Sequence, residues 1–77
     1  APAAEGRGIA TAAVAEVVRL VFVATGAQRV LGITDSRNRP SARLLERVGF
    51  RRQEDRSAVF RGEPCTEQVY ALSREQG

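Results

Sequence analysis

A long stretch with few polar side chains, residues 9–25, constrains the fold of this chain more than any other feature. It consists mainly of Ala, Val and Leu. An apolar segment of this length predicts a helix that is mostly buried, and Gly26 is the residue type that often ends a helix in the left-handed conformation. We therefore expect a core helix over these residues, preceded by a loop of small residues over positions 1–8.

Three shorter segments are bounded by turn-forming residues. Residues 29–34 are rich in β-branched side chains and too short for a helix, which predicts a strand. Residues 50–54 and 68–72 predict two further strands, and the polar segment between them, with Gly-Glu-Pro at 62–64, predicts a hairpin connection. On the last strand, alternation should place Tyr70 on the face opposite to its two neighbours.

A second helix is predicted between the first two strands. Pro40 fits its first turn, where the missing N–H costs nothing, and apolar residues recur at helical spacing over residues 44–48. Gly49 should end this helix. Because a residue before proline avoids the helical conformation, either Asn38 or Arg39 is expected to be the N-cap.

The order helix, strand, helix, strand, strand predicts an α/β fold with a small mixed sheet and two helices, since a strand–helix–strand step usually joins parallel strands. Such strands need cover on both faces, which two helices do not provide. We therefore expect residues 1–77 to form one unit, and the uncovered part of the sheet indicates that something is missing from it. With 77 residues, its core should give only marginal stability.

Composition argues against several classes of function. Cys65 is the only cysteine, so no disulfide forms within the chain, and no histidine is present to activate it as a nucleophile. The basic residues are all arginine, but they are interleaved with acids and leave a net charge of only +3. This mixture is typical of a solvated surface, so a small basic nucleic-acid binder is the weaker alternative.

The sequence also predicts a cellular setting. The start of the chain has no basic segment followed by an apolar one, so no secretory signal is expected. The longest uninterrupted apolar run, residues 20–24, is too short to cross a bilayer. Together with the single cysteine, these features predict a soluble, cytoplasmic protein.

The first motif with chemical meaning is Glu-Gly-Arg-Gly-Ile-Ala-Thr at residues 5–11, which places two glycines directly before the first helix. Glycines let the backbone approach a ligand closely, and unpaired N–H groups at a helix start favour an anion such as phosphate. The motif is neither a P-loop nor a dinucleotide fingerprint. A plain turn explains the glycines equally well.

The second motif is Asp35-x-x-Asn38-x-x-Ser41, followed by Leu-Leu-Glu-Arg-Val-Gly-Phe at residues 44–50. A spacing of three brings Asn38 and Ser41 together at the opening turn of a helix, where both could face one cleft. On spacing alone, a helix cap with a serine in the first turn is the simpler interpretation.

Together, the two motifs resemble the GNAT acyltransferase superfamily, and in particular its branch of ribosomal-protein N-terminal acetyltransferases. In that family a Gln/Arg-x-x-Gly-x-Gly/Ala loop opens a helix and binds the CoA pyrophosphate, and Glu5-x-x-Gly8-x-Ala10 is similar to it. The family's Asn-x-x-Ser helix, ending in Leu-Glu-Lys-x-Gly-Phe, resembles residues 38–50, with Arg47 for lysine. The resemblance covers nearly the whole chain. It implies that residues 1–77 form a single partial domain, the C-terminal half of an N-acetyltransferase that uses acetyl-CoA and no metal. The N-terminal strands and helices of the family fold would then be absent from these residues.

The resemblance also implies roles for individual residues. Ser41 stands where this branch places the hydroxyl that protonates or stabilises the departing CoA thiolate, and Asn38 would bind the pantetheine arm or the helix opening. The acceptor would be a primary amine, such as a protein N-terminus. The CoA phosphates would be held by the backbone N–H groups of Gly6, Arg7, Gly8, Ile9, Ala10 and Thr11.

The chain departs from the family pattern in three places. Glu5 puts a negative charge beside an anionic ligand and should weaken phosphate binding unless it points away. Leu45 occupies the position of a tyrosine in many relatives, which favours Ser41 as the acid or means that there is no dedicated acid. The strand that precedes the glycine loop in the family, and that supplies an oxyanion contact, is not found before Glu5.

A rival interpretation is a non-catalytic module that keeps half of the fold. It would pair through the exposed strand at 29–34 with another copy or with a missing N-terminal half. Tyr70 could approach an acceptor, but a core role is the expected one. The apolar residues of the two helices and the following strand are assigned to packing: Val14, Val17, Val18, Val21, Phe22, Leu44, Val48 and Phe50.

Overall fold

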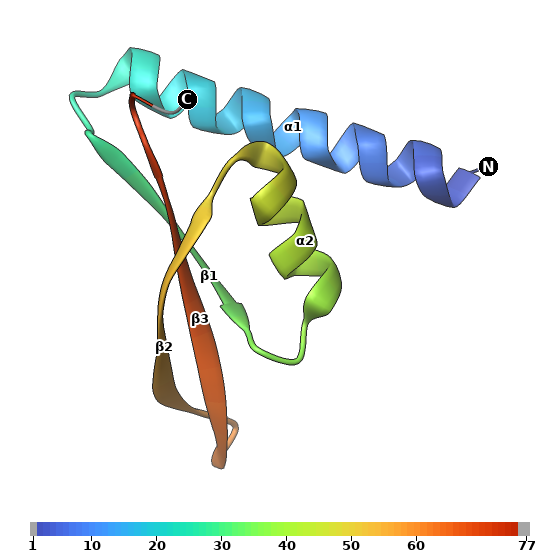
Figure 1. Ribbon diagram of the computed structural model, residues 1–77, viewed down its shortest axis with the longest axis vertical. Coiled ribbons are helices and arrows are strands. Elements are labelled where there is room, and N and C mark those ends of the chain that lie inside the picture. Colours follow the sequence, from blue (N-terminus) through green and yellow to red (C-terminus); the bar gives the residue numbers. More distant parts are fainter. Residues whose placement is uncertain (1, 76–77) are drawn as a thin grey trace.

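The computed structural model describes the backbone of residues 2–75 and the side chains of residues 8–75. Its elements, in chain order, are α1 (Pro2–Ala24), β1 (Arg29–Asp35), α2 (Arg39–Val48), β2 (Arg51–Phe60) and β3 (Glu63–Ser73). The predicted order helix, strand, helix, strand, strand and the α/β class are confirmed (Figure 1).

The three strands form one sheet in the order β1-β3-β2. The central strand, β3, is antiparallel to both of its neighbours. β1 and β2 therefore run in the same direction, as their helical connection predicts, but they do not pair. The expected mixed sheet is corrected to an antiparallel one, because the hairpin returns β3 into the space between the two strands that run alike.

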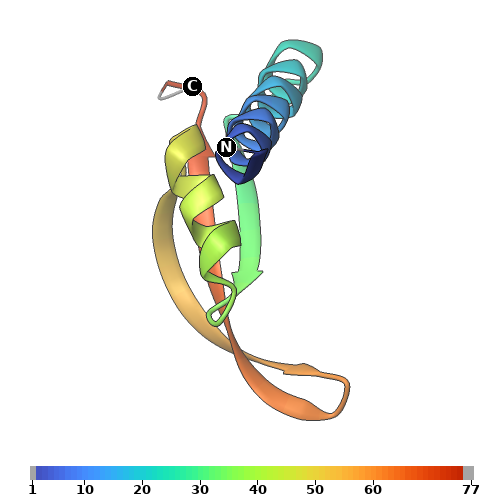
Figure 2. The same ribbon diagram turned by 90° about the vertical axis from the view of Figure 1, so that its right-hand side faces the viewer.

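The core lies on the face of the sheet that α1 and α2 cover (Figure 2). Tyr70 has only 2% of its surface exposed, which confirms its assignment to the core. Alternation along β3 turns its two neighbours to the other face, as predicted. The buried members of the core cluster are Val18, Phe22, Phe50, Tyr70 and Leu72.

The opposite face of the sheet carries apolar side chains that no helix of the described chain covers. Leu31 and Ile33 of β1 pair with Ala71 and Val69 of β3, so the four side chains share this face. Leu31 is 53% exposed and Ile33 is 48% exposed. The sheet therefore has one face packed by helices and one open face, on which the two β1 side chains are exposed while Val69 and Ala71 of β3 are buried.

α1 begins at Pro2, so the loop expected over residues 1–8 is wrong from residue 2 onward. Proline fits a first helical turn, and Ala, Glu and Arg in this segment are good helix formers. These preferences outweigh Gly6 and Gly8, although each glycine costs about 1 kcal/mol in a helix interior relative to alanine.

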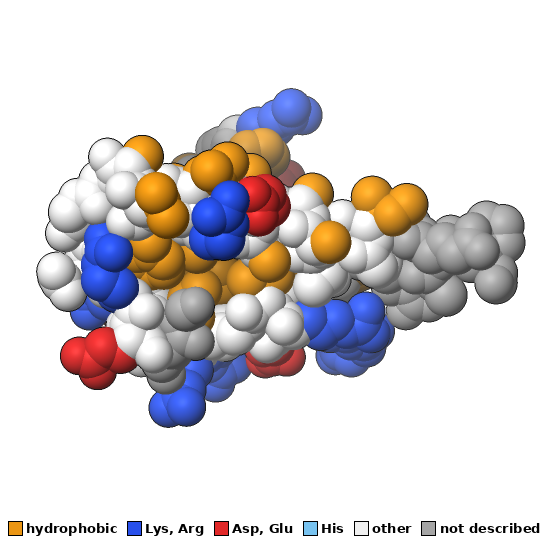
Figure 3. Space-filling model, turned by 90° about the horizontal axis from the view of Figure 1, so that it is seen from above, with side chains coloured by type: hydrophobic (Ala, Val, Ile, Leu, Met, Phe, Trp, Pro, Cys, Tyr) orange, Lys and Arg blue, Asp and Glu red, His pale blue; other side chains and the backbone are white. Residues whose placement is uncertain are grey.

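The burial and the end of α1 also differ from expectation. Val18 and Phe22 are buried, but Val17 is 59% exposed and is not a packing residue in this structure. The mostly buried helix was a wrong prediction, because apolar composition shows what a helix could bury and only the fold decides what covers it. Further exposed apolar side chains of α1 are Ile9, Leu20 and Val23, and Figure 3, seen from above, shows hydrophobic side chains scattered over this surface.

Thr25, rather than Gly26, ends α1. The Thr25 hydroxyl donates to the carbonyl of Val21 at 2.8 Å and accepts a hydrogen bond from the N–H of Ala27 at 3.1 Å. Gly26 does not take the left-handed conformation that was predicted for it.

α2 has well-formed caps at both ends. Asn38 is the N-cap, and its side-chain oxygen accepts a hydrogen bond from the N–H of Ser41 at 3.2 Å. Gly49 ends the helix in the left-handed conformation, with φ of 116°, and donates to the carbonyls of Leu45 and Glu46. The predicted position of Pro40 and the glycine stop are therefore confirmed, and the open choice of cap is settled as Asn38.

β2 and β3 are longer than predicted and are joined by a tight turn at Arg61 and Gly62, both with positive φ. The polar segment expected as a connection is mostly strand. Its polar residues pair across the strands, as in the ion pair of Arg56 with Glu67 at 3.1 Å. β3 pairs with β1 only from Glu67 onward, so the end of the hairpin extends beyond β1 (Figure 2).

Arg74 ties the end of β3 to the end of α1. Its guanidinium donates to the carbonyls of Thr25 and Ala27, each at 2.9 Å, and lies 5.1 Å from the centre of the Phe22 ring. These carbonyls follow the C-terminus of α1, where a cation is favoured. The contact fixes the position of α1 over the sheet.

Candidate functional site

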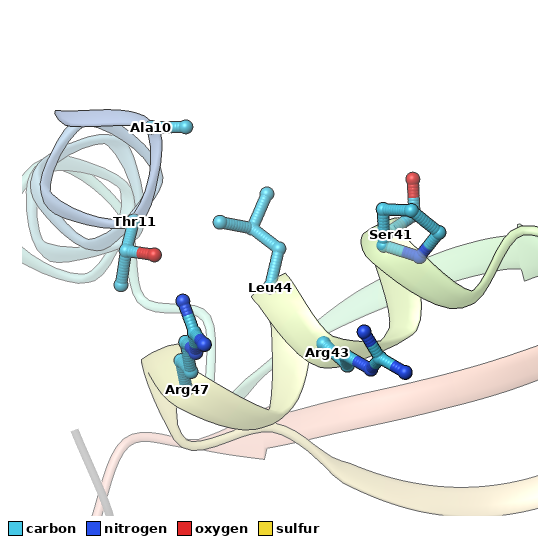
Figure 4. Close-up of a pocket in the computed structure, with 7 residues that line it drawn as sticks. Ala10, Thr11, Ser41, Arg43, Leu44 and Arg47 are labelled. Atoms are coloured by element: carbon cyan, nitrogen blue, oxygen red, sulfur yellow. The ribbon is translucent and has the colours of Figure 1, made fainter. Parts of the chain in front are cut away.

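A cavity of about 490 Å³ lies between α1 and α2. Leu44 points from α2 toward α1, with Thr11 and Arg47 on one side of it and Ser41 on the other (Figure 4). Residues from both sequence motifs therefore meet at one site. The lining residues are Ala10, Thr11, Pro40, Ser41, Arg43, Leu44 and Arg47.

Ser41 lines this cavity from the first turn of α2, and its N–H is bonded to Asn38. The N-cap geometry holds this turn in place, so the hydroxyl is presented from a fixed backbone. Asn38 itself acts as a helix cap, which is the simpler of its two interpretations. Its role toward a ligand stays a prediction.

The segment predicted to hold phosphates is brought to the cavity only in part. Ala10 and Thr11 line it, whereas Gly8 and Ile9 are exposed on α1 and are not among its lining residues. The side chains at positions 6 and 7 lie outside the described residues. In a continuous helix from Pro2, the N–H groups from position 6 onward bond within the helix, so they can hold a phosphate only if the helix starts later.

Two arginines of this cavity were missed in the sequence analysis. Arg43 and Arg47 follow Pro40 at helical spacing, together with Leu44, so they share a face of α2 with it. That spacing was the available signal. Neither arginine has an ion pair or side-chain hydrogen bond with any residue whose side chain the structure describes.

A second cavity, of about 330 Å³, lies on the other side of α2, toward β2 and β3. Its lining is mostly polar and includes the acid Glu46, in contrast to the first cavity. Tyr70 borders it from the core and donates to Gln68 at 3.5 Å. The lining residues are Ser36, Arg39, Ala42, Arg43, Glu46, Arg52, Gln68 and Tyr70.

Asp35 shapes the loop that leads into α2. Its carboxylate accepts hydrogen bonds from the guanidinium of Arg37 at 3.0 and 3.1 Å and from the Arg37 backbone N–H at 2.8 Å. The bonds to the guanidinium, and then the bond to the backbone, hold the pKa of Asp35 below its ordinary value. A carboxylate that stays ionised at neutral pH therefore bonds both the side chain and the backbone at the start of this loop.

Two further findings limit other interpretations. Cys65 lies on β3 opposite Ala58 and lines neither of the two cavities. Within residues 2–75, no helix combines the length and the apolarity needed to cross a membrane.

Comparison with known proteins gives a family. The model of the acetyltransferase (GNAT) domain matches residues 1–51. No curated protein sequence matches the chain at a significant level.

Several solved structures share the fold. A GNAT-family acetyltransferase from Bacillus anthracis is 26% identical, covers 88% of this chain with 42% of its own length, and has a TM-score of 0.79. A ribosomal-protein-S5-alanine acetyltransferase from Vibrio fischeri is 19% identical, with coverage of 91% and 40% and a TM-score of 0.78. An aminoglycoside acetyltransferase in complex with coenzyme A is 22% identical, with coverage of 92% and 39% and a TM-score of 0.73.

The chain thus spans about two fifths of the length of these solved relatives. The two structures that are less than 25% identical to this chain support the fold alone. The family model matches residues 1–51, which are most of the sequence. From the domain match and the shared fold, the chain belongs to the GNAT acetyltransferase family.

Proposed function

We propose that this chain carries the acetyl-CoA-binding part of an N-acetyltransferase that transfers an acetyl group to a primary amine, with a protein N-terminal amine as the acceptor. The observation that carries the proposal is the cavity between α1 and α2, where Thr11 of the first motif and Ser41 of the second meet. A solved relative of the same fold contains coenzyme A, and another is a ribosomal-protein acetyltransferase.

The cavity has the chemistry to bind a long ligand whose two ends differ in charge. Leu44 offers apolar surface between a cationic end at Arg47 and a hydroxyl at Ser41, and Ala10 and Pro40 add to the apolar lining. Acetyl-CoA has an anionic nucleotide, an extended arm and a thioester. Its arm would lie along Leu44, and its thioester would lie near Ser41.

The reaction is a direct attack of the neutral amine nitrogen on the thioester carbonyl carbon. The C–N bond forms, the C–S bond breaks, and the amine loses a proton as the CoA thiolate takes one up. Ser41 would donate a hydrogen bond to the departing sulfur and so stabilise its developing charge.

Calorimetric titration of acetyl-CoA into the 77-residue chain tests this proposal. We expect saturable binding in the wild-type chain and its loss in Gly8→Glu, which adds a negative charge and a bulky side chain at the predicted phosphate segment. The matched variant is Gly26→Glu, which adds the same charge beyond the other end of α1, where a new side chain also meets open space. Absence of binding in the wild-type chain would contradict the proposal for this chain.

Ser41→Ala tests the proposed catalytic role in any form of the protein that turns over. We expect acetyl-CoA affinity to persist and the rate of transfer to fall by about tenfold or more, because general acid assistance is worth about that much or more. Ser36→Ala is the control, since Ser36 lines only the second cavity. Equal rates in Ser41→Ala and wild type would remove Ser41 from the mechanism.

A second candidate function is supported by the open face of the sheet. Leu31 and Ile33 lie on an edge strand and are about half exposed. In this alternative the chain is a non-catalytic module that pairs with a second copy of itself through β1. Sedimentation at increasing concentration should show a dimer that Leu31→Lys abolishes. A wild-type chain that stays monomeric would dismiss this alternative.

A further inference from the structure

We propose that Arg47 binds a phosphate group of acetyl-CoA and so fixes the direction in which the cosubstrate lies, with its nucleotide toward Thr11 and its thioester toward Ser41. The inference rests on the proposed function and adds to it a specificity residue on α2, the helix opposite the predicted phosphate segment.

The first argument is the separation of charge across α2. The lining of the cavity between α1 and α2 contains Arg43 and Arg47 and no acid, whereas Glu46 lines the second cavity. Successive residues of a helix point in different directions, so the sequence Glu46-Arg47 places its two charges on different sides. An anion in the first cavity therefore meets only cationic side chains among the described lining residues.

The second argument is that Arg47 is available to a ligand. Several arginines of the described chain are engaged in ion pairs, namely Arg19 with Glu16, Arg37 with Asp35, and Arg56 with Glu67, whereas Arg43, beside Arg47 in the cavity, is not. Arg47 has no such partner among the described side chains. An unpaired guanidinium offers several N–H donors in a planar fork that matches a phosphate group, and charge-assisted bonds of this kind are strong.

The third argument is position along the cavity. The guanidinium of Arg47 lies near Thr11, and Leu44 separates it from Ser41 (Figure 4). A phosphate bound by Arg47 would leave the uncharged arm of the ligand to pass over Leu44. The thioester would then reach the hydroxyl that the proposed reaction needs.

A purely structural role for Arg47 makes a different prediction. Arg47 lies in the last turn of α2, where a cation favours the helix through its dipole without any ligand. In that case its replacement would lower stability and leave ligand affinity unchanged. The ligand-binding role and the structural role can be distinguished by measuring both stability and ligand affinity on the same variants.

The test compares Arg47→Gln with Arg39→Gln in the 77-residue chain. Both variants remove one positive charge from α2, but Arg39 lines only the second cavity. Calorimetric titration is performed with acetyl-CoA and with adenosine 3′,5′-bisphosphate, which carries phosphates but no pantetheine arm. Arg47→Lys keeps a charge at the same place and guards against loss of folding, which thermal melting of each variant reports.

We expect Arg47→Gln to weaken binding of both ligands by about tenfold, as the loss of one charge-assisted hydrogen bond predicts, and Arg39→Gln to change it by less than about twofold. Arg47→Lys should lie between wild type and Arg47→Gln. Equal effects of the two glutamine variants, or unchanged binding in Arg47→Gln, would overturn the role of Arg47 while leaving the proposed function in place. A wild-type chain that binds neither ligand would overturn both.

Discussion

The two helices of this chain are held in place in different ways. α2 is amphipathic, is capped at both ends by Asn38 and Gly49, and has neighbours on both of its sides. α1 is apolar around much of its circumference, and within the described chain only one side, with Val18 and Phe22, is covered. The comparison teaches that α2 is stabilised largely by local chemistry, whereas α1 depends on one contact surface, through which it packs against α2 and the core residues of the sheet.

The largest expected effect comes from shortening a side chain on the covered side of α1, which contains Val18 and Phe22. Phe22→Ala should reduce the free energy of unfolding by about 3 kcal/mol or more, because it removes a buried ring and leaves a cavity. Chemical denaturation measures the loss. Val23→Ala is the matched control on the other side of α1, where the side chain is 71% exposed, and should change stability by less than about 0.5 kcal/mol. Similar losses in both variants would mean that the outer side is also covered.

A larger side chain at Gly32 of β1 tests how closely α2 packs against this strand. A Cβ at this position would lie 2.9 Å from a methyl group of Leu45, so the Leu45 side chain must move to accept one. Gly32→Val should destabilise the fold by about 2 kcal/mol through overpacking. Leu45→Ala in the same chain should recover part of that loss, and denaturation curves of the single and double variants give the coupling.

Arg74 tests the second attachment of α1. Arg74→Ala removes two hydrogen bonds to carbonyls after the helix and the contact with the Phe22 ring. We expect a loss of about 1–2 kcal/mol in denaturation experiments, since a hydrogen bond from a charged group is worth about that much and one of the two bonds here is partly buried. Arg61→Ala, which removes a similar ring contact at the exposed hairpin turn, should have little effect. If both variants lose the same amount, Arg74 does not hold α1.

A smaller effect is expected at the cap of α2. Asn38→Ala leaves the N–H of Ser41 without its side-chain partner and should cost about 1 kcal/mol. Asn38→Ser keeps a capping oxygen and should recover most of that stability. Thermal melting checks both, and an alanine variant as stable as wild type would show that α2 does not depend on its cap.

The smallest effect concerns the loop before α2 and depends on pH. Because the pKa of Asp35 is lowered by Arg37, the pair stabilises the folded state above the ordinary pKa of an aspartate, and this contribution is lost as the pH falls through the lowered value. Arg37→Ala should therefore lower the free energy of unfolding at neutral pH. In acid, the free energies of unfolding of the variant and of the wild type should become equal. Carboxyl NMR should show the pKa of Asp35 rising in the variant.

The same contrast explains what the sequence could predict. α2 was predicted almost to the residue, because its proline, its periodicity and its terminal glycine act within a few positions of one another. The early start of α1 was missed because a glycine pair suggested a loop, and its exposed side was missed because burial depends on what packs there. The length of β2 and β3 was missed because polar residues such as Arg56 and Glu67 are stabilised by cross-strand partners.

The candidate site shows the same division. Ser41 and Asn38 could be placed from their spacing, whereas the participation of Arg43 and Arg47 required the orientation of α2 relative to α1. Arg74 carried no recognisable sequence signal, since its partners are backbone carbonyls almost fifty positions earlier in the chain.

The order of the strands has a consequence for how this sheet assembles. β3 is central in space but comes last of the three described strands, so within this sheet β1 and β2 bond only to a strand that is made after them. During synthesis α1 and α2 can form early, but the backbone N–H and C=O groups of β1 and β2 stay unpaired until β3 is made. Closing the sheet then requires contacts between segments far apart in sequence, which predicts a slow, late and cooperative folding step.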